Sequence, residues 1–552
     1  MTAQSRPIRL LLLVDDWVQP LWASSMLEDV VADGSAIICG VALNESSDTP
    51  AAGGSRFVRL MKNWRAIPYG VFQRLDRRST ADDPFKPADI RRLCEGVPVR
   101  PITPRRTAFS DYFPDADLAW MRSLDADVGL RLGFRILRGE VLQVPRHGVW
   151  SFHHGDNRHY RGGPAGFWEV YENAPLTGAI LQRLSEDLDA GEILYRTTVP
   201  THPTSVSLNR AVLYWEAAQG FKAALHRARR GAPPSSPSAD IVPYGARMYV
   251  APGPREAVSA IASLQLRRVA RGIAARRRKL QWHVGYRFNR LRTDGDSPEL
   301  SPHRLTILPS PFGSLWADPF VVSEGDRHWI IFEEVPPGAA MGRISAVEID
   351  EKGKAGEAIP ILEPPHHLSY PCVFRWQGDW YMAPESYDAG RLDIYRAKRF
   401  PFDWEVVRTL FTDAPVVDAT IFEHDSKWWL FALRPTPRTM IGGELHAWYA
   451  DNPLEEWIPH PMNPLRAGVD GSRPAGLPFL SRGRLVRPGQ LGAPHYGAGI
   501  VFFEVETLTT SAFSERPIGD IVPRWDRRVA GYHTVNAAGK VTVGDILMDR
   551  RR

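Results

Sequence analysis

Two side chains in the N-terminal half of this sequence are of types suited to proton transfer. His153 ends the apolar run 148–153, and Asp189 belongs to a Leu-Asp-Ala-Gly turn that ends at Gly191. An imidazole ordinarily titrates near neutrality, so a histidine can donate to an oxyanion or relay a proton. A carboxylate beside it can hold the imidazole, or an ordered water, in a productive orientation. Together the two residues predict general acid–base chemistry, although each type is also common in structural turns.

Alternating strands and helices surround these residues. Continuous apolar runs are typical of strands buried on both faces of a parallel sheet, and they occur at 10–14, 36–43, 127–133 and 148–153. Helical spacing of apolar residues covers 22–31. This alternation predicts an α/β Rossmann-like layer fold with ligands bound at the carboxyl ends of the strands.

The order of short segments between 132 and 194 resembles the catalytic core of the formyltransferase family. That family includes glycinamide ribonucleotide, methionyl-tRNA and sugar N-formyltransferases. The segments are Leu-Gly-Phe-Arg-Ile-Leu (132–137), Ser-Phe-His (151–153), Tyr-Arg-Gly-Gly-Pro (160–164), Thr-Gly-Ala-Ile (177–180) and Glu-Asp-Leu-Asp-Ala-Gly-Glu-Ile-Leu (186–194). The resemblance covers roughly residues 8–225.

The resemblance implies transfer of a formyl group from a reduced folate to an amine. His153 and Asp189 match the family's catalytic histidine and aspartate. Arg161 is a weaker candidate for substrate contact, because an arginine in a Gly-Gly-Pro loop is usually solvated. The implied donor is 10-formyltetrahydrofolate, and neither a metal nor a nucleophilic cysteine is required. The residues implied to line the folate pocket are Leu132, Gly133, Phe134, Ile136 and Leu137.

One residue departs from the family pattern. Ser151 stands where the family has an asparagine whose amide donates to the developing oxyanion. Losing such a donor costs about 3 kcal/mol of transition-state stabilisation. Asn157 could swing in as a replacement, and His154 is another candidate. Three interpretations stay open: a rearranged oxyanion site, a different acyl donor, or a weakened enzyme.

A connector with a basic helix follows the first half. Residues 226–245 are rich in Arg, Pro and Ser, which suits a linker. The helical pattern that follows places Val258, Ile261, Leu264, Val269 and Ile273 broadly on one side, with many arginines on the others. We favour an interdomain helix with a solvated charged face, and the alternative is weak contact with an anionic membrane surface.

The C-terminal half repeats a short unit about every 50 residues, which predicts a β-propeller of about five blades. It resembles the propellers of arabinanase-like glycoside hydrolases and, more closely, the N-terminal domain of plant glucosamine inositolphosphorylceramide transferases. In the hydrolases acidic residues at inner strand starts surround the sugar. Asp318, in Ala-Asp-Pro-Phe, matches that pattern best, with Glu385 and Asp418 as partners, although Tyr370 stands where another acid is expected. A carbohydrate-binding or scaffolding propeller is at least as well supported as a hydrolase.

Composition limits the remaining classes. The net charge of +5 is small for 552 residues and excludes a dedicated nucleic-acid binder. Three scattered cysteines fit a reducing compartment, and no apolar run is long enough to span a membrane, so we expect a cytoplasmic protein.

We therefore predict a multidomain N-formyltransferase: an α/β domain at 1–228, a linker with a basic helix at 229–281, and a five-bladed propeller at 282–552. The acceptor is expected to be an amino sugar in glycan or polysaccharide biosynthesis. The alternatives are a glycan-active propeller, hydrolase or glycosyl transfer domain, beside a degenerate formyltransferase domain, or a non-catalytic glycan-binding protein.

Overall fold

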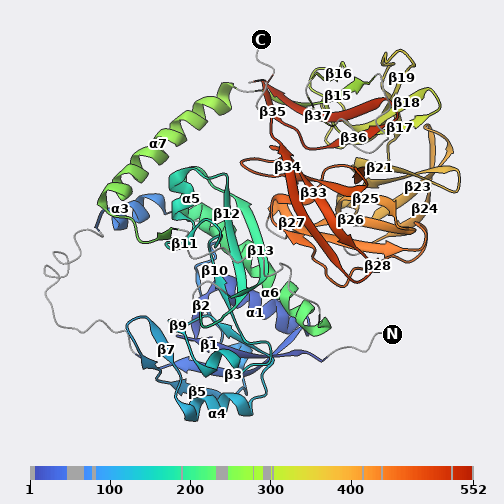
Figure 1. Cartoon of the computed structure of the whole chain (residues 1–552). Helices are drawn as coiled ribbons and strands as arrows, with labels where there is room; N and C mark the ends of the chain where they lie inside the picture. The colour runs from blue at the N-terminus through green and yellow to red at the C-terminus, as the bar shows by residue number, and fades with distance from the viewer. Residues whose placement is uncertain are drawn as a thin grey trace. The chain divides into compact units, whose positions relative to one another are not determined.

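The computed structural model describes residues 6–46, 67–77, 82–187, 191–231, 247–277, 279–289, 300, 302, 304–412, 416–436, 439–523, 526 and 528–549. The chain forms two compact units, Met1–Gly272 and Ile273–Arg552. Each unit has its own layers and its own hydrophobic core (Figure 1).

The first unit is built on a seven-stranded sheet. The apolar runs of the sequence form its centre, where four strands neighbour one another in parallel, and a fifth parallel strand lies at one edge. At the other edge two strands run antiparallel, so the sheet is mixed rather than purely parallel. In spatial order the strands are β13 (Glu192–Pro200), β12 (Leu176–Arg183), β10 (Val149–His153), β8 (Val128–Arg131), β1 (Ile8–Val14), β3 (Ala36–Asn44) and β5 (Val99–Ile102).

Helices cover this sheet. The expected helix at 22–31 is α1 (Leu21–Ala32), and α6 (Val206–Arg230) packs against α1, β12 and β13. The sequence defines both ends of α6: Ser205 Oγ accepts a hydrogen bond from the Leu208 amide, and Gly231 ends the helix with φ 63°. The other helical segments are α3 (Ile67–Asp76), η2 (Arg91–Cys94), α4 (Asp115–Ser123), η3 (Glu140–Gln143), α5 (Phe167–Glu172) and α7 (Pro254–Arg277).

Short strand pairs complete the first unit. They are β2 (Val18–Pro20) with β4 (Pro87–Asp89), β7 (Ser110–Tyr112) with β6 (Arg105–Arg106) and β9 (Ile136–Leu137), and β11 (Arg161–Gly162) with β14 (Met248–Tyr249). The β11–β14 pair ties the loop after β10 to the segment that leads into α7.

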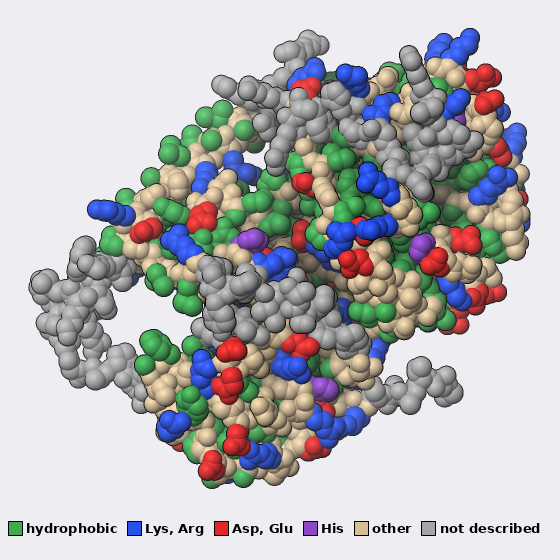
Figure 2. Space-filling view, viewed as in Figure 1, with side chains coloured by type: hydrophobic (Ala, Val, Ile, Leu, Met, Phe, Trp, Pro, Cys, Tyr) green, Lys and Arg blue, Asp and Glu red, His purple; other side chains and the backbone are tan. Residues whose placement is uncertain are grey.

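Helix α7 has two apolar faces instead of the single face expected. Leu264 is buried on one side and Ile261 half-buried, whereas Val258, Val269 and Ile273 are exposed. Figure 2 shows hydrophobic side chains along this helix at the upper left.

The arginines of α7 are not all solvated, which corrects the expectation of a solvated charged face. Arg267 donates to the Val170 and Tyr171 carbonyls, and Arg268 donates to the Thr204 carbonyl. Residues 232–246, which include most of the expected linker, lie outside the described residues. No helix of the described residues combines the length and the apolarity needed to cross a bilayer.

The second unit is a propeller of five antiparallel sheets, as predicted. The first blade has β17 (Leu315–Glu324), β18 (Arg327–Val335), β19 (Arg343–Ile349) and β20 (Ile359–Leu362), and the second has β21 (Ser369–Trp376), β22 (Asp379–Glu385), β23 (Leu392–Arg399) and β24 (Asp403–Leu410). The 3₁₀ turn η5 (Tyr387–Ala389) follows β22. The third has β25 (Val417–His424), β26 (Lys427–Thr436), β27 (Thr439–Ala450), β28 (Ile458–Pro459) and β29 (Arg466–Ala467), and the fourth has β30 (Asp470–Pro474), β31 (Phe479–Ser481), β32 (Arg484–Leu491), β33 (Gly499–Leu508) and β34 (Phe513–Ile521).

The fifth blade closes the ring by combining strands from both ends of the unit. In it β15 (Leu280–Phe288) pairs along its whole length with β37 (Val541–Asp549). The remaining strands of this blade are β16 (Thr306–Ile307), β35 (Val529–Gly531) and β36 (Val535–Ala538). Pairing the first strand with the last leaves the ring without a loose seam, which stabilises a propeller.

Candidate functional site

Ser151 and His153 lie at the carboxyl end of β10 and line one cavity of about 170 Å³, called the His153 cavity below. Ser151 is buried and His153 half-buried. Asp189 lies outside the described residues, although Asp187 and Gly191 on either side of it line the same cavity. The full lining set is Arg131, Ile136, Leu137, Ser151, Phe152, His153, Gln182, Leu184, Ser185, Glu186, Asp187 and Gly191.

The segment expected to hold the folate contributes to this cavity in part. Ile136 and Leu137 line it. Gly133 instead packs against the end of β1, where a Cβ would fall 2.2 Å from the Asp15 backbone nitrogen, so only glycine fits. Phe134 is buried in the core, and Leu132 donates its amide to the Leu13 carbonyl. Of the five implied residues, Leu132, Gly133 and Phe134 are therefore not among those that line the cavity.

The Asp15 carboxylate holds the backbone of the segment around Phe134 in place. Phe134 adopts a left-handed backbone with φ 62°, and its amide donates to Asp15 Oδ1 at 2.7 Å. Asn44, at the end of β3, donates to the same oxygen at 2.7 Å. One carboxylate thus ties together the ends of β1, β3 and β8.

Arg131 is a cavity residue that the sequence analysis missed. It is the last residue of β8, and its Nη1 donates to Ser151 Oγ at 2.8 Å. The parallel pairing of β8 with β10 sets Arg131 directly beside Ser151. The signal available in the sequence was a single charged residue at the end of an apolar strand, where a ligand-facing side chain is expected.

His153 and His154 have different environments although they are adjacent. His153 Nε2 lies 3.4 Å from the Tyr160 carbonyl oxygen, and its ring borders the cavity. His154 stacks on Tyr214 with ring centroids 3.6 Å apart and packs edge-on against Trp22. Burial lowers the pKa of His154 to about 3, so this ring is neutral. His154 is not among the residues that line the cavity, so we do not assign it as the missing oxyanion donor.

Asn157 and Arg161 also lie away from the cavity lining. Asn157 is buried, and its Oδ1 accepts a hydrogen bond from Arg196 Nη2 at 3.1 Å, so it is held in place rather than poised to swing in. Arg161 is buried in β11, not solvated as a Gly-Gly-Pro arginine usually is. Arg196 also forms an ion pair with Asp156 at 2.7 Å, which holds the guanidinium where Asn157 can bind it.

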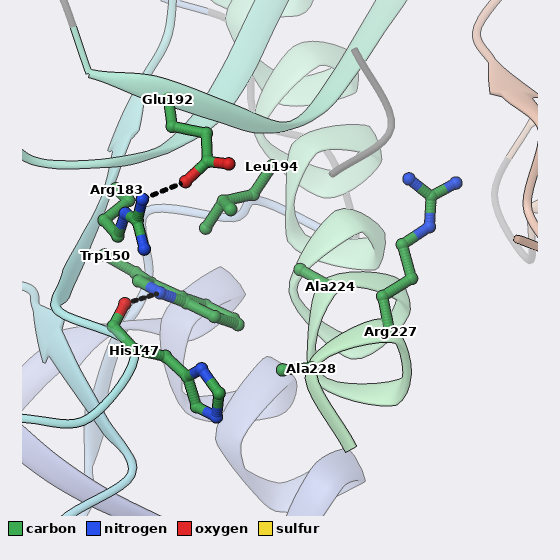
Figure 3. Close-up of a pocket in the computed structure, with 8 residues that line it drawn as sticks. All are labelled: His147, Trp150, Arg183, Glu192, Leu194, Ala224, Arg227 and Ala228. Carbon is green, nitrogen blue, oxygen red and sulfur yellow. Dashed lines mark hydrogen bonds and ion pairs between the residues drawn. The ribbon is translucent and has the colours of Figure 1, made fainter. Parts of the chain in front are cut away.

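A second, smaller cavity of about 120 Å³ lies between the sheet and α6. Figure 3 shows Trp150 at its centre, between the Arg183–Glu192 ion pair and His147. Arg227, on α6, points away from the other labelled side chains. Arg183 and Glu192 neutralise each other at 2.5 Å, and the lining residues of this cavity include one histidine, His147, but no serine.

In the propeller, the first strands of three consecutive blades share the same backbone irregularity. Asp318, Tyr370 and Asp418 each sit at a register shift of the first strand of their blade, with φ of 50°, 41° and 51°. Such a bulge re-aims a side chain relative to its neighbours, and a left-handed non-glycine residue costs about 1–2 kcal/mol. Tyr370, which interrupts the acidic pattern, uses its hydroxyl to bind Thr420 Oγ1 and the Gly476 amide.

The re-aimed acids join a buried group that we call the inner acid cluster. It contains two short ion pairs: Arg473 binds Asp418 at 2.5 Å, and His533 binds Asp545 at 2.5 Å. Asp418 also receives a hydrogen bond from Gln490. The members of the cluster are Asp318, Glu333, Glu385, Asp418, Asp545, Arg473 and His533.

Protonation offsets the excess of acids in this cluster. Burial raises the pKa of Asp318 to about 6, and burial together with neighbouring carboxylates raises the pKa of Glu333 and Glu385 well above the ordinary range. Burial alone would lower the pKa of His533, but the charges of Asp545 and Asp318 outweigh it and raise the pKa. Asp318, His533 and Asp545 hold ligand-type atoms within 4.8 Å of one another, an arrangement that could also hold a cation.

The two units together define a two-part class of protein: an α/β unit with a cavity at the carboxyl ends of its strands, followed by a five-bladed propeller. Residues 306–529 match the family model described as glucosamine inositolphosphorylceramide transferase 1, N-terminal. The transferase of that name from Arabidopsis thaliana is 37% identical over 215 residues, which cover 38% of this chain and 27% of the relative.

The N-terminal unit has a different relative. Methionyl-tRNA formyltransferase from Sorangium cellulosum is 28% identical over 127 residues, or 23% of this chain and 39% of that protein. Among solved structures, a family 117 glycoside hydrolase from Zobellia galactanivorans is 12% identical, covers 48% of this chain and 90% of its own, and has a TM-score of 0.33. The resemblances to formyltransferases and to the plant transferase domain are confirmed, and the chain spans about a quarter to two fifths of these curated relatives.

Proposed function

We propose that the protein transfers a formyl group from a reduced folate, 10-formyltetrahydrofolate, to an amine. The supporting observation is that Ser151 and His153 of β10 and Ile136 and Leu137 of β9, two separate elements, line one cavity at the carboxyl ends of β8 and β10. The residues around the cavity suit such a donor. The lining includes apolar side chains that could cover a flat ring and polar groups that could bind the reacting carbonyl.

His153 has the position and the residue type to move the proton that the attacking amine must lose. Its ring borders the cavity and is held by a neutral partner, the Tyr160 carbonyl, rather than by a buried carboxylate. Asp189 is proposed to orient His153 or a water; it lies outside the described residues, and Asp187 and Gly191 on either side of it line the cavity. The formyl donor supplies the carbonyl that is attacked.

The acceptor proposed is an amino sugar. The propeller matches a domain of an enzyme whose name includes glucosamine, and a glycan-recognising propeller would favour a sugar amine. The cytoplasm and a reducing environment remain the proposed setting. Weak contact with an anionic membrane surface is proposed for α7, because Leu266 and Val269 are exposed on a helix that also exposes Arg271 and Arg276.

The test of formyl transfer is a comparison of histidine variants of the whole chain. His153→Ala should lower formyl transfer to glucosamine-type acceptors by about 10²–10⁴-fold, while formyl-folate binding and the unfolding transition stay as in wild type. His147→Ala, which changes a histidine of the second cavity, is the matched control and should keep full activity. Equal activity of the two variants would exclude the assignment of His153.

A second candidate function places the chemistry in the propeller. The observation in its favour is that Asp318, Glu385 and Asp418 belong to one buried cluster and that the pKa of Asp318 is raised to about 6. A glycosidase built on them should turn over aryl glycosides, and Asp318→Asn should abolish that turnover. Sugar binding without turnover by the wild type would leave the propeller as a recognition domain.

A further inference from the structure

The Arg131 guanidinium is held at the floor of the His153 cavity by three neutral oxygens. Nε donates to the Arg135 carbonyl at 3.1 Å, Nη2 to the Phe134 carbonyl at 3.2 Å and Nη1 to Ser151 Oγ at 2.8 Å. Within the described ranges no carboxylate lies within ion-pair distance of this side chain, so its charge is not neutralised by a direct partner.

The geometry leaves part of this guanidinium available to a ligand. A guanidinium has five N–H donors in a rigid fork, and the three bonds above leave one N–H on each terminal nitrogen. Arg131 is one of the residues that line the cavity, so these two N–H groups are its candidate donors to a ligand there. Burial lowers the pKa of Arg131, yet arginine remains protonated in proteins. The cavity therefore holds a fixed positive charge.

A hydrogen-bond acceptor lies on the strand next to Ser151. Gln182 on β12 pairs directly with Ser151 on β10 and lines the same cavity. Its side chain is buried, and its Oε1 accepts no hydrogen bond from the part of the chain that the structure describes. Buried polar atoms normally have partners. A cavity that leaves both a donor fork and an acceptor unpaired is suited to a polar ligand that offers an oxygen and an N–H.

We propose that Arg131 is the oxyanion donor of this site, in place of the amide that Ser151 does not supply; this rests on the proposed formyl transfer. The attacking amine nitrogen forms a bond to the formyl carbon, and the carbonyl electron pair moves to its oxygen, which Arg131 binds through its free N–H groups. His153 takes the proton lost by the amine. The oxyanion electron pair then re-forms the carbonyl as the bond from the formyl carbon to the folate nitrogen breaks, and His153 gives its proton to that nitrogen.

Ser151 also has a positive role in this arrangement. An asparagine side chain at the same place would extend toward Nη1, which lies only 2.8 Å from Ser151 Oγ. A serine is short enough to leave room for the guanidinium and accepts one of its hydrogen bonds. Charge-assisted hydrogen bonds are roughly twice as strong as neutral ones, so the exchange of amide for guanidinium retains oxyanion stabilisation.

The experiment compares four forms of the full chain: wild type, Arg131→Met, Arg131→Lys and the double variant Arg131→Met with Ser151→Asn. Formate is the first probe, because its two oxygens on one carbon imitate the oxyanion without any turnover. Formyl-folate binding and kcat for formyl transfer are measured beside it. Arg131→Lys retains a cation and serves as the second test if the methionine variant fails to fold.

We expect Arg131→Met to lose formate binding and to lower kcat by about 10²–10³-fold, with formyl-folate affinity little changed. The double variant, which restores the family's amide, should recover at least a tenth of the lost kcat, a recovery that a merely structural role of Arg131 would not produce. Formate binding that depends on Arg131, in a wild type without formyl transfer, would overturn the proposed function but keep the anion site. Folded Arg131 variants with wild-type formate binding and kcat would overturn the inference.

Discussion

The His153 cavity and the inner acid cluster both collect buried charged side chains, but they satisfy them in opposite ways. In the cavity, Arg131 binds only neutral oxygens and Gln182 Oε1 has no partner among the described residues. In the cluster, Arg473 and His533 bind carboxylates at 2.5 Å each. Residue types alone would favour the cluster as the active site, since it contains more acids.

The difference lies in where the unsatisfied hydrogen-bonding groups are. A buried donor or acceptor without a partner costs free energy, so it persists mainly where a ligand completes it. Groups that complete one another stabilise the fold instead. By this criterion the His153 cavity is prepared for a polar ligand, whereas the cluster pairs its two cations with carboxylates and leaves the Gln490 Oε1 atom without a hydrogen bond from the described residues.

Breaking the cluster should cost stability without affecting the cavity. Arg473→Met leaves Asp418 buried beside Gln490 with no cation, which should lower the free energy of unfolding of the propeller by about 3–5 kcal/mol. Chemical denaturation of the full chain measures the loss. Arg327→Met, which removes an exposed ion pair with Glu348, is the control and should change little. A loss of formyl-folate binding in Arg473→Met would contradict the separation of the two sites.

Protonation of the cluster should make propeller stability depend on pH. The folded-state pKa of Asp318, about 6, exceeds the ordinary value of 3.8, so its contribution is complete below pH 3.8 and is lost as pH rises through 6. The free energy of unfolding should fall by up to about 3 kcal/mol across that window. Asp318→Asn should remove this part of the slope. Asp425→Asn is matched in backbone conformation, with φ 50°, but is exposed, and it should leave the slope unchanged.

Helix α7 exposes a stripe of apolar side chains formed by Val258, Leu266, Val269 and Ile273. Val269→Ser should change the free energy of unfolding by no more than about 0.5 kcal/mol, because the side chain is exposed. It should weaken binding to phosphatidylserine–phosphatidylcholine vesicles by a few-fold. Leu264→Ser, on the buried face, is the contrast and should destabilise the protein. Unchanged vesicle binding in Val269→Ser would exclude this stripe as a membrane contact.

The strands were predictable because their burial is recorded in continuous apolar runs. The runs at 10–14 and 36–43 became β1 and β3, and the repeated aromatic units became blades. The antiparallel edge of β12 and β13 was not predictable, since apolar runs do not specify direction. Arg131 was missed because its role depends on β8 lying beside β10, a neighbour relation that no local pattern contains. The position of Asn157 was not predictable either, because Arg196, distant in the chain, holds it away from the cavity lining.

The stacking of His154 on Tyr214 has a practical consequence for measuring the site. With a pKa of about 3, His154 does not change charge over the range in which enzymes are usually assayed. A ring resonance of His154 in a proton NMR titration should stay constant from about pH 5 to 9. The chain thus contains an internal reference one residue from its proposed base, against which a small change in the His153 signal on adding a folate or an amine can be assigned without ambiguity.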